Sequence, residues 1–257
     1  MKEAFHIATT GRQGPVLVDM PKDIQMEKAA VDWDVPMNLP GYQNSTTPLA
    51  SDEQVRQVAA AIKSAKRPVA YCGGGIISAE ADGPLREFIR KTGMPVTTTI
   101  MGLGAFPGDD PLCMDMLGMH GSVYSNWAVR DCDLLLAFGV RFDDRVTGKL
   151  EAFAKHAKII HVDIDPSELN KNKPAHLPIV SDMKYFLEKL NEVVEPNADI
   201  DAWVAQCAKW KQEHPFHYDQ KFEGILQQHA IFELSKLTRD RETIVAVGVG
   251  QHQMWSA

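Results

Sequence analysis

The sequence DLLLAFG at Asp133–Gly139 decides the fold of this chain. Its central residues are all apolar, whereas a strand with one wet face alternates apolar and polar residues. The run is therefore predicted to be a strand buried on both faces of a parallel sheet. Four further short runs rich in Val, Ile, Leu and Thr have the same character, namely Pro68–Cys72, Pro95–Thr99, Lys158–Ile164 and Pro178–Val180.

Helical patterns lie between or beside these predicted strands. Ser51–Ala65 begins with a capping box and carries its apolar residues on one face. Pro84–Thr92 has proline in its first turn and Gly93 as its stop signal, and Ser181–Val194 has apolar residues at helical spacing. Strands that alternate with helices predict an α/β fold with a doubly wound, mostly parallel, Rossmann-like sheet over residues 51–194.

The flanks of this region look like parts of other domains. Glu3–Thr9 is predicted to be the end of a helix, and Pro15–Met20 and Thr243–Val247 are predicted to be strands. We therefore predict five parts. Residues 1–30 end a first domain, residues 31–50 form a proline-rich linker, and residues 51–194 form the α/β domain. Residues 195–240 form a second linker with amphipathic helices around Ala202–Lys211 and Ile225–Leu237, and residues 241–257 begin a third domain.

Composition and charge exclude several classes of protein. The 257 residues are 44% hydrophobic, and 27 Lys and Arg against 34 Asp and Glu give a net charge of -7, which argues against nucleic-acid binding. No apolar run approaches the roughly 18 residues that span a membrane, and the N-terminus lacks a signal-peptide core. The scattered cysteines Cys72, Cys113, Cys132 and Cys207 form no CxxC pair, which favours reduced thiols and predicts a cytoplasmic location.

Ligands of open parallel sheets bind at the carboxyl ends of the strands, so the residues after each strand are candidates. Gly73–Gly75 would let a backbone approach a phosphate closely, and Gly102 and Gly104 could do the same after the next strand. No GxGxxG motif is present, and a plain turn is the alternative at both places. His120, within Leu117–Gly121, is a lone histidine, and such residues are more often structural than ligand-binding.

Charged residues follow the next two strands. Residues 141–145 contain two Arg and two Asp, and guanidinium groups bind phosphate or stack on flat rings; an internal ion-pair loop is the alternative. Asp163 could accept hydrogen bonds from ribose or ribityl hydroxyls. Asp165 is explained as a helix cap with Glu168 closing its capping box, and Asp182 could also be a simple N-cap. These residues predict a nucleotide-type cofactor in an α/β crevice.

Several motifs resemble a known family. TTGRQGPVLVDMPKD at Thr9–Asp23 resembles the end of the first domain of thiamine diphosphate (ThDP) enzymes. MGLG at Met101–Gly104, LGMHG at Leu117–Gly121 and RFDDRVTGK at Arg141–Lys149 resemble the large catalytic subunit of acetolactate synthase, also called acetohydroxyacid synthase. GQHQMW at Gly250–Trp255 resembles the opening of the third domain of that subunit. The resemblance covers essentially the whole chain.

The resemblance implies three α/β domains, which are pyrimidine-binding, central and pyrophosphate-binding. Residues 1–30 would end the first domain, 51–194 would be the central domain, which binds FAD without net redox use, and 241–257 would begin the ThDP-binding domain. The implied FAD contacts are Arg12, Gly74, Thr99, Ile100, Leu117, Gly118, Met119, His120, Gly139, Val140, Arg141, Phe142, Asp143, Asp163, Ile164 and Asp182.

The same resemblance implies that Lys22 and Arg145 border the substrate channel and that Gln251 and His252 touch ThDP. The implied reaction, in branched-chain amino acid biosynthesis, is a carbon–carbon bond-forming transfer. Pyruvate is condensed with a second 2-oxo acid, pyruvate or 2-oxobutanoate, with release of CO2. ThDP and Mg²⁺ would serve the complete protein, which is implied to be a homo-oligomer that can carry a regulatory small subunit.

The sequence departs from the family pattern in what it lacks. The glutamate that activates ThDP and the GDG metal motif are not found, since Gly108–Asp110 reads GDD. We therefore expect no catalytic residue and no metal ligand in this chain, and no activity from it alone. Two other functions stay open: a different ThDP-dependent decarboxylase or carboligase, which should lack RFDDRVTGK, and a non-catalytic nucleotide-binding module.

Overall fold

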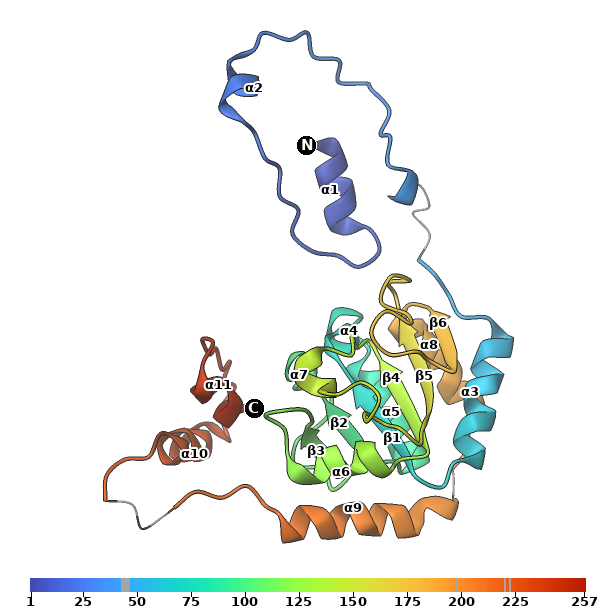
Figure 1. Cartoon of the computed structure of the whole chain (residues 1–257), viewed down its shortest axis with the longest axis vertical. Helices are drawn as coiled ribbons and strands as arrows, with labels where there is room; N and C mark the ends of the chain where they lie inside the picture. The colour runs from blue at the N-terminus through green and yellow to red at the C-terminus, as the bar shows by residue number, and fades with distance from the viewer. Residues whose placement is uncertain (43–46, 197, 220, 222) are drawn as a thin grey trace.

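A computed structural model describes residues 1–42, 47–196, 198–219, 221 and 223–257. Its centre is a six-stranded sheet in the order β3-β2-β1-β4-β5-β6, and every pair of neighbouring strands is parallel (Figure 1). The chain winds outward from β1 to one edge and returns beside β1 to wind to the other, which confirms the predicted doubly wound fold. The strands are β1 (Pro68–Cys72), β2 (Val96–Thr98), β3 (Cys113–Met116), β4 (Leu134–Phe138), β5 (Lys158–Asp163) and β6 (Leu177–Val180).

The two central strands are the best buried. β1 pairs with β4 along its whole length, from Pro68 opposite Leu134 to Cys72 opposite Phe138, and every residue of both strands is buried. Both faces of the sheet are covered, so a strand at this position needs an apolar residue at every place. This requirement is the physical reason that DLLLAFG identifies the fold.

Helices cover both faces of the sheet and enclose two hydrophobic cores. In the first core, Phe138 of β4 contacts the rings of Phe88 and Phe186. In the second, Tyr71 of β1 contacts Phe142 and Phe153. The first core includes residues of α3 (Asp52–Ser64), α5 (Asp82–Thr92) and α8 (Met183–Val193), and the second those of α6 (Val123–Asp131) and α9 (Asp201–Glu213).

The local signals for helix ends are confirmed. Ser51 and Gln54 form the predicted capping box of α3, with hydrogen bonds in both directions. Gly93 ends α5 in the left-handed conformation, with φ of +70°, which a residue with a side chain adopts at a cost. By contrast, β3 and α6 were not predicted from the sequence. The short edge strand β3 contains Asp115, so it shows no continuous apolar run.

The two flanks lie outside the packed unit (Figure 1). The predicted helix end is confirmed by α1 (Lys2–Thr9), but the predicted strands Pro15–Met20 and Thr243–Val247 are wrong: neither forms strand structure. A strand needs a neighbour to satisfy its backbone N–H and C=O groups, and the described part of the chain provides none there. The other flanking elements are α2 (Lys22–Met26), η1 (Pro40–Tyr42), α10 (Gln227–Thr238) and α11 (Gln251–Ser256).

Packing on the sheet continues beyond residue 194. Trp203 and Cys207 of α9 are buried in the second core, and the Trp203 indole donates a hydrogen bond of 3.0 Å to the carbonyl of Pro68. The division into five parts stays a prediction, and parts of both linkers (43–46, 197, 220 and 222) lie outside the described residues. Among the described helices, none combines the length and apolar character that crossing a bilayer requires.

Candidate functional site

Glycines bring the carboxyl ends of β1 and β4 into backbone contact. Gly73 donates to the carbonyl of Phe138 at 2.9 Å, and Gly75 donates to that of Gly139 at 3.2 Å. A Cβ atom on Gly73 would lie 2.2 Å from the Gly139 carbonyl oxygen, and a Cβ atom on Gly75 would lie 2.6 Å from the Gly139 Cα atom. These two glycines are therefore required by the turn. Gly74, the predicted contact, is half-buried at the start of α4 (Gly74–Ser78).

The loops after β2 and β3 each present an exposed methionine side chain. Thr99 caps η2 (Ile100–Gly102) by accepting a hydrogen bond from the Gly102 N–H at 3.1 Å. Contacts join α4 to η2, and Met101 of η2 is 70% exposed. Met119, in the loop after β3, is 63% exposed. Exposed methionines at the end of a sheet offer an adaptable apolar surface for a flat ring.

The segment Leu117–His120 is held against the loop after β4. The Met119 N–H donates to the carbonyl of Arg145 at 2.8 Å, and the Asn126 side chain bonds both the N–H and the C=O of Gly118. Asn126 was not predicted, because no sequence signal links it to a glycine eight residues earlier. The Met119 bond brings the segment predicted to contact FAD into direct contact with Arg145, which was predicted to border the substrate channel.

Arg141 and Asp143 form the loop after β4. Their side chains lie 3.6 Å apart and are 56% and 42% exposed, so the ion pair that the sequence left as an alternative is present. Asp143 also caps α7 (Asp144–Thr147) through the Arg145 N–H, and this hydrogen bond lowers the pKa of its carboxyl. Such an exposed pair is weak, so the Arg141 guanidinium stays available to a ligand.

Phe142 fixes the backbone of the same loop. Its side chain is buried against Tyr71 and His161, and its φ of +48° is unusual for a residue with a side chain. Two residues earlier, the carbonyl of Val140 accepts a hydrogen bond of 2.8 Å from His161 Nε2. The loop is therefore anchored from the protein interior while Arg141 faces solvent.

Asp163 ends β5 with a buried carboxylate. Its side chain is 7% exposed and accepts a hydrogen bond of 2.9 Å from the Asp165 N–H. Burial raises the pKa of Asp163 to about 6, against the lowering effects of that hydrogen bond and of Arg12. A carboxyl group placed in this way gains from further hydrogen-bond donors, such as the hydroxyls of a ribose.

Arg12 reaches this strand end from the N-terminal flank. Its Nη1 atom lies 2.9 Å from Glu168 Oε1 and 3.7 Å from Asp165 Oδ2. The predicted capping box of Asp165 and Glu168 is wrong, because no helix follows and Asp165 instead accepts from the Ser167 N–H and hydroxyl. Glu168 bonds cations, which are stronger partners for a carboxylate than a backbone N–H.

Asp182 acts as the helix cap that the sequence left open. Its carboxylate accepts a hydrogen bond of 2.8 Å from the Tyr185 N–H at the start of α8, and its own N–H donates to the carbonyl of Pro48. Ile164, directly after β5, is half-buried at the same edge of the sheet. Both residues therefore lie at a strand end, as predicted.

Four residues were predicted to border the substrate channel or to contact ThDP. Lys22 in α2 and Gln251 and His252 in α11 lie away from the strand ends (Figure 1), whereas Arg145 joins the site through its carbonyl group. The structure therefore does not bring Lys22 and Arg145 together. Among the described residues, no group of three or more His, Cys, Asp or Glu side chains is arranged so that it could hold a metal ion.

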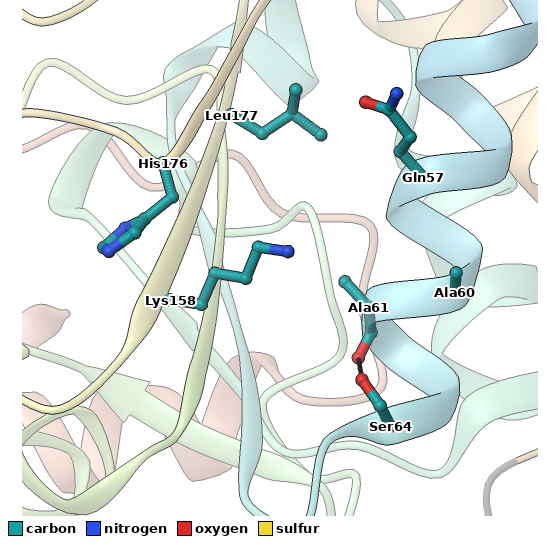
Figure 2. A pocket seen from close by; sticks show the side chains of 7 residues that line it. All are labelled: Gln57, Ala60, Ala61, Ser64, Lys158, His176 and Leu177. Atoms are coloured by element: carbon teal, nitrogen blue, oxygen red, sulfur yellow. Dashed lines mark hydrogen bonds between the residues drawn. The ribbon is translucent and has the colours of Figure 1, made fainter.

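A depression of about 420 Å³ lies at the opposite edge of the sheet (Figure 2). It is bounded by α3 on one side and by Lys158 and Leu177, the first residues of β5 and β6, on the other. His176 beside it already accepts the Ile159 N–H through Nδ1. The groove is open and shares no residue with the predicted site, so we place the candidate site at the carboxyl ends of the strands.

A dinucleotide cofactor such as FAD fits this edge on three observations. The buried carboxylate of Asp163 gains from hydrogen-bond donors, the guanidinium of Arg141 is half exposed, and the exposed Met101 presents apolar surface beside the half-buried Gly74. Together these groups would bind a hydroxyl, a phosphate and a ring, which are the parts of a dinucleotide.

The chain is similar to several known proteins. The family described as "Thiamine pyrophosphate enzyme, central domain" matches residues 55–190. The chain is 52% identical to acetolactate synthase 1, chloroplastic, of Oryza sativa subsp. japonica, 50% to acetolactate synthase 1, chloroplastic, of Zea mays and 48% to acetolactate synthase, chloroplastic, of Arabidopsis thaliana. Each match covers 100% of this chain, but the chain spans only about 40% of the length of these relatives.

One prediction is corrected by these relatives. They are named chloroplastic, so the predicted cytoplasmic location is wrong. That prediction depended on the cysteines, and all four are indeed buried and free. Reduced thiols are expected in any reducing compartment, so they could not distinguish one such compartment from another.

Proposed function

Because the chain belongs to the family of thiamine pyrophosphate enzymes, whose central domain it contains, we propose that it is part of an acetolactate synthase catalytic subunit and binds FAD at its strand ends. The single observation that carries this proposal is the set of groups at that edge, which combines the buried carboxylate of Asp163 with the half-exposed guanidinium of Arg141. About 50% identity to plant acetolactate synthases over the whole chain supports it.

We assign roles to the chain's own residues as follows. Asp163 accepts hydrogen bonds from ribose or ribityl hydroxyls, and Arg141 pairs with a phosphate or lies against the isoalloxazine ring. Gly74 allows the cofactor to approach the backbone, and Met101 and Met119 contact its ring. Arg12 completes the site from the N-terminal flank, beside Asp163.

The activity proposed for the complete protein is the condensation of pyruvate with a second 2-oxo acid, with release of CO2. ThDP, when bound, supplies the electron sink for such chemistry, and Mg²⁺ would hold its diphosphate. In this proposal residues 1–30 and 241–257 belong to the domains on either side, Lys22 and Arg145 border the substrate channel, and Gln251 and His252 contact ThDP. A homo-oligomer with a regulatory small subunit is part of the same proposal.

Flavin titration tests the cofactor assignment. We expect the whole chain to quench FAD fluorescence on binding, and Arg141→Lys to weaken binding by about 1–3 kcal/mol, because an ammonium group cannot pair as a planar fork. Arg130→Lys is the matched control, since Arg130 pairs with Asp131 at the end of α6 and lies outside the proposed site. Equal affinities for Arg141→Lys and the wild type would favour a purely structural ion-pair loop.

A further inference from the structure

The turn between β5 and β6, residues 165–173, contacts two segments that are far apart in the sequence. Through Glu168 it holds Arg12 of the N-terminal flank, and through Asn172 it holds the backbone at Arg141 and Phe142. Arg12 and Arg141 are the two arginines assigned to FAD above. Neither Glu168 nor Asn172 has a place in that assignment.

The Glu168 carboxylate is buried and holds two cations. The side chain is 6% exposed, and its Oε1 atom lies 2.9 Å from Arg12 Nη1 and 3.2 Å from Lys171 Nζ. Within the described part of the chain, the Oε2 atom is buried without a hydrogen-bond partner. Removing a carboxylate from water is costly unless cations compensate for it, so Glu168 provides a strong reason for Arg12 to stay at this place.

Besides Glu168, only Asp165 of the same turn is ion-paired with Arg12 among the described residues, and its Oδ2 atom lies farther away, at 3.7 Å from Arg12 Nη1. The flank around Arg12 is exposed: no residue of α1 or α2 is buried, and Arg12 itself is 47% exposed. The ion pair to Glu168 spans 156 positions in the sequence. It therefore fixes an otherwise exposed segment beside Asp163.

Asn172 acts in the same way on the second arginine. Its Nδ2 atom donates to the carbonyl of Arg141 at 3.1 Å and to that of Phe142 at 3.3 Å. Two further hydrogen bonds fix the turn itself. The Asn170 side chain accepts the Ala175 N–H, and Lys173 donates to the carbonyl of Leu150. Both flavin arginines thus depend on one turn.

We propose that residues 165–173 form a clamp in which Glu168 and Asn172 are positioning residues that set the guanidinium of Arg12 and the backbone of Arg141 for cofactor binding. The effect of the clamp on FAD binding rests on the proposed function. The attachment of Arg12 and of the Arg141 backbone to the turn does not rest on it, so the clamp and the proposed function can fail separately.

Limited trypsin digestion of the whole chain tests the clamp without flavin. We expect Glu168→Gln to speed cleavage after Arg12, relative to cleavage after the exposed Lys28, by about tenfold, as for the loss of a charge-assisted hydrogen bond. Asn172→Ala should speed cleavage after Arg141 and leave cleavage after Arg12 unchanged. Glu192→Gln, which neutralises an exposed carboxylate paired with Lys189, is the matched control and should change neither.

Flavin titration of the same variants tests the functional half. Glu168→Gln and Asn172→Ala should each weaken FAD binding about tenfold, and Glu168→Gln should have no further effect in an Arg12→Gln background. Unchanged cleavage after Arg12 in Glu168→Gln would overturn the clamp. Faster cleavage with unchanged FAD affinity would overturn the positioning role. If the wild type binds no FAD, the proposed function fails, and the cleavage pattern still decides whether the clamp exists.

Discussion

Two segments of this chain have similar apolar sequences and opposite environments. β4 reads LLLAF at Leu134–Phe138, and all its residues are buried. The segment Thr243–Val247 reads TIVAV, forms no strand, and has Ile244 95% exposed. The difference is that β4 lies between β1 and β5 and shares its backbone hydrogen bonds with both. An apolar run thus favours a strand, but neighbouring strands decide whether it forms one.

The largest expected contrast between the two segments is in hydrogen exchange. Amide protons of β4 should exchange only through opening of the whole core, whereas those of Thr243–Val247 should exchange almost freely. With a typical domain stability of at least about 5 kcal/mol, the rates should differ by about a thousandfold or more. Native-state exchange followed by mass spectrometry measures both segments in one sample, at a concentration where the chain is monomeric. Equal protection of the amide protons in the two segments would show that Thr243–Val247 is as well ordered as β4.

Truncation of a side chain sharpens the same contrast. Phe138→Ala should lower the free energy of unfolding by about 3–5 kcal/mol, because Phe138 is fully buried between the rings of Phe88 and Phe186. Ile244→Ala removes an apolar side chain that is almost fully exposed, and it should change stability by less than about 0.5 kcal/mol. Urea denaturation gives both values. A cost above about 2 kcal/mol for Ile244→Ala would show that this flank is packed in solution.

The smallest of the three effects concerns a charge in the core. Asp163 has a pKa raised by burial to about 6, above the ordinary value of 3.8. For an acid raised in this way, the folded state loses stability as pH rises from about 4 to about 6 and keeps that loss at higher pH. Asp163→Asn should therefore raise the free energy of unfolding by about 1–3 kcal/mol at pH 8 and by almost nothing at pH 4.

Denaturation across that pH range measures this prediction. Asp19→Asn in the exposed N-terminal flank is the matched control. A stability gain for Asp163→Asn that is the same at pH 4 and pH 8 would show that the carboxyl carries no penalty from burial. Such a result would also weaken the assignment of Asp163 as an acceptor for cofactor hydroxyls.

Most of the central fold could be predicted because its signals are local. A strand covered on both faces must be apolar throughout, and the capping box at Ser51 and the left-handed stop at Gly93 depend on residues within one helical turn. The edge strand β3 was missed because Asp115 interrupts its apolar run. Runs in the flanks were predicted to be strands from their apolar character alone, although no partner strand lies beside them among the residues that the structure describes.

The candidate site shows the same division between local and distant information. Glycines and charged residues directly after the strands could be placed from the sequence, because strand ends converge in every parallel sheet. The partner of Glu168 could not, because Arg12 lies 156 positions away, and a capping box was the best local explanation. Asn126 and Asn172 were missed for the same reason, since each side chain bonds backbone groups that only folding brings near.

The sequence by itself therefore determined five of the six parallel strands and most of the covering helices, and it indicated the edge at which a cofactor would bind. Tertiary structure alone decided which apolar runs became strands and which carboxylates paired with cations rather than capping helices. The physical reason is range. Burial patterns and caps act over a few residues, whereas ladder hydrogen bonds and ion pairs join groups whose proximity depends on the path of the whole chain.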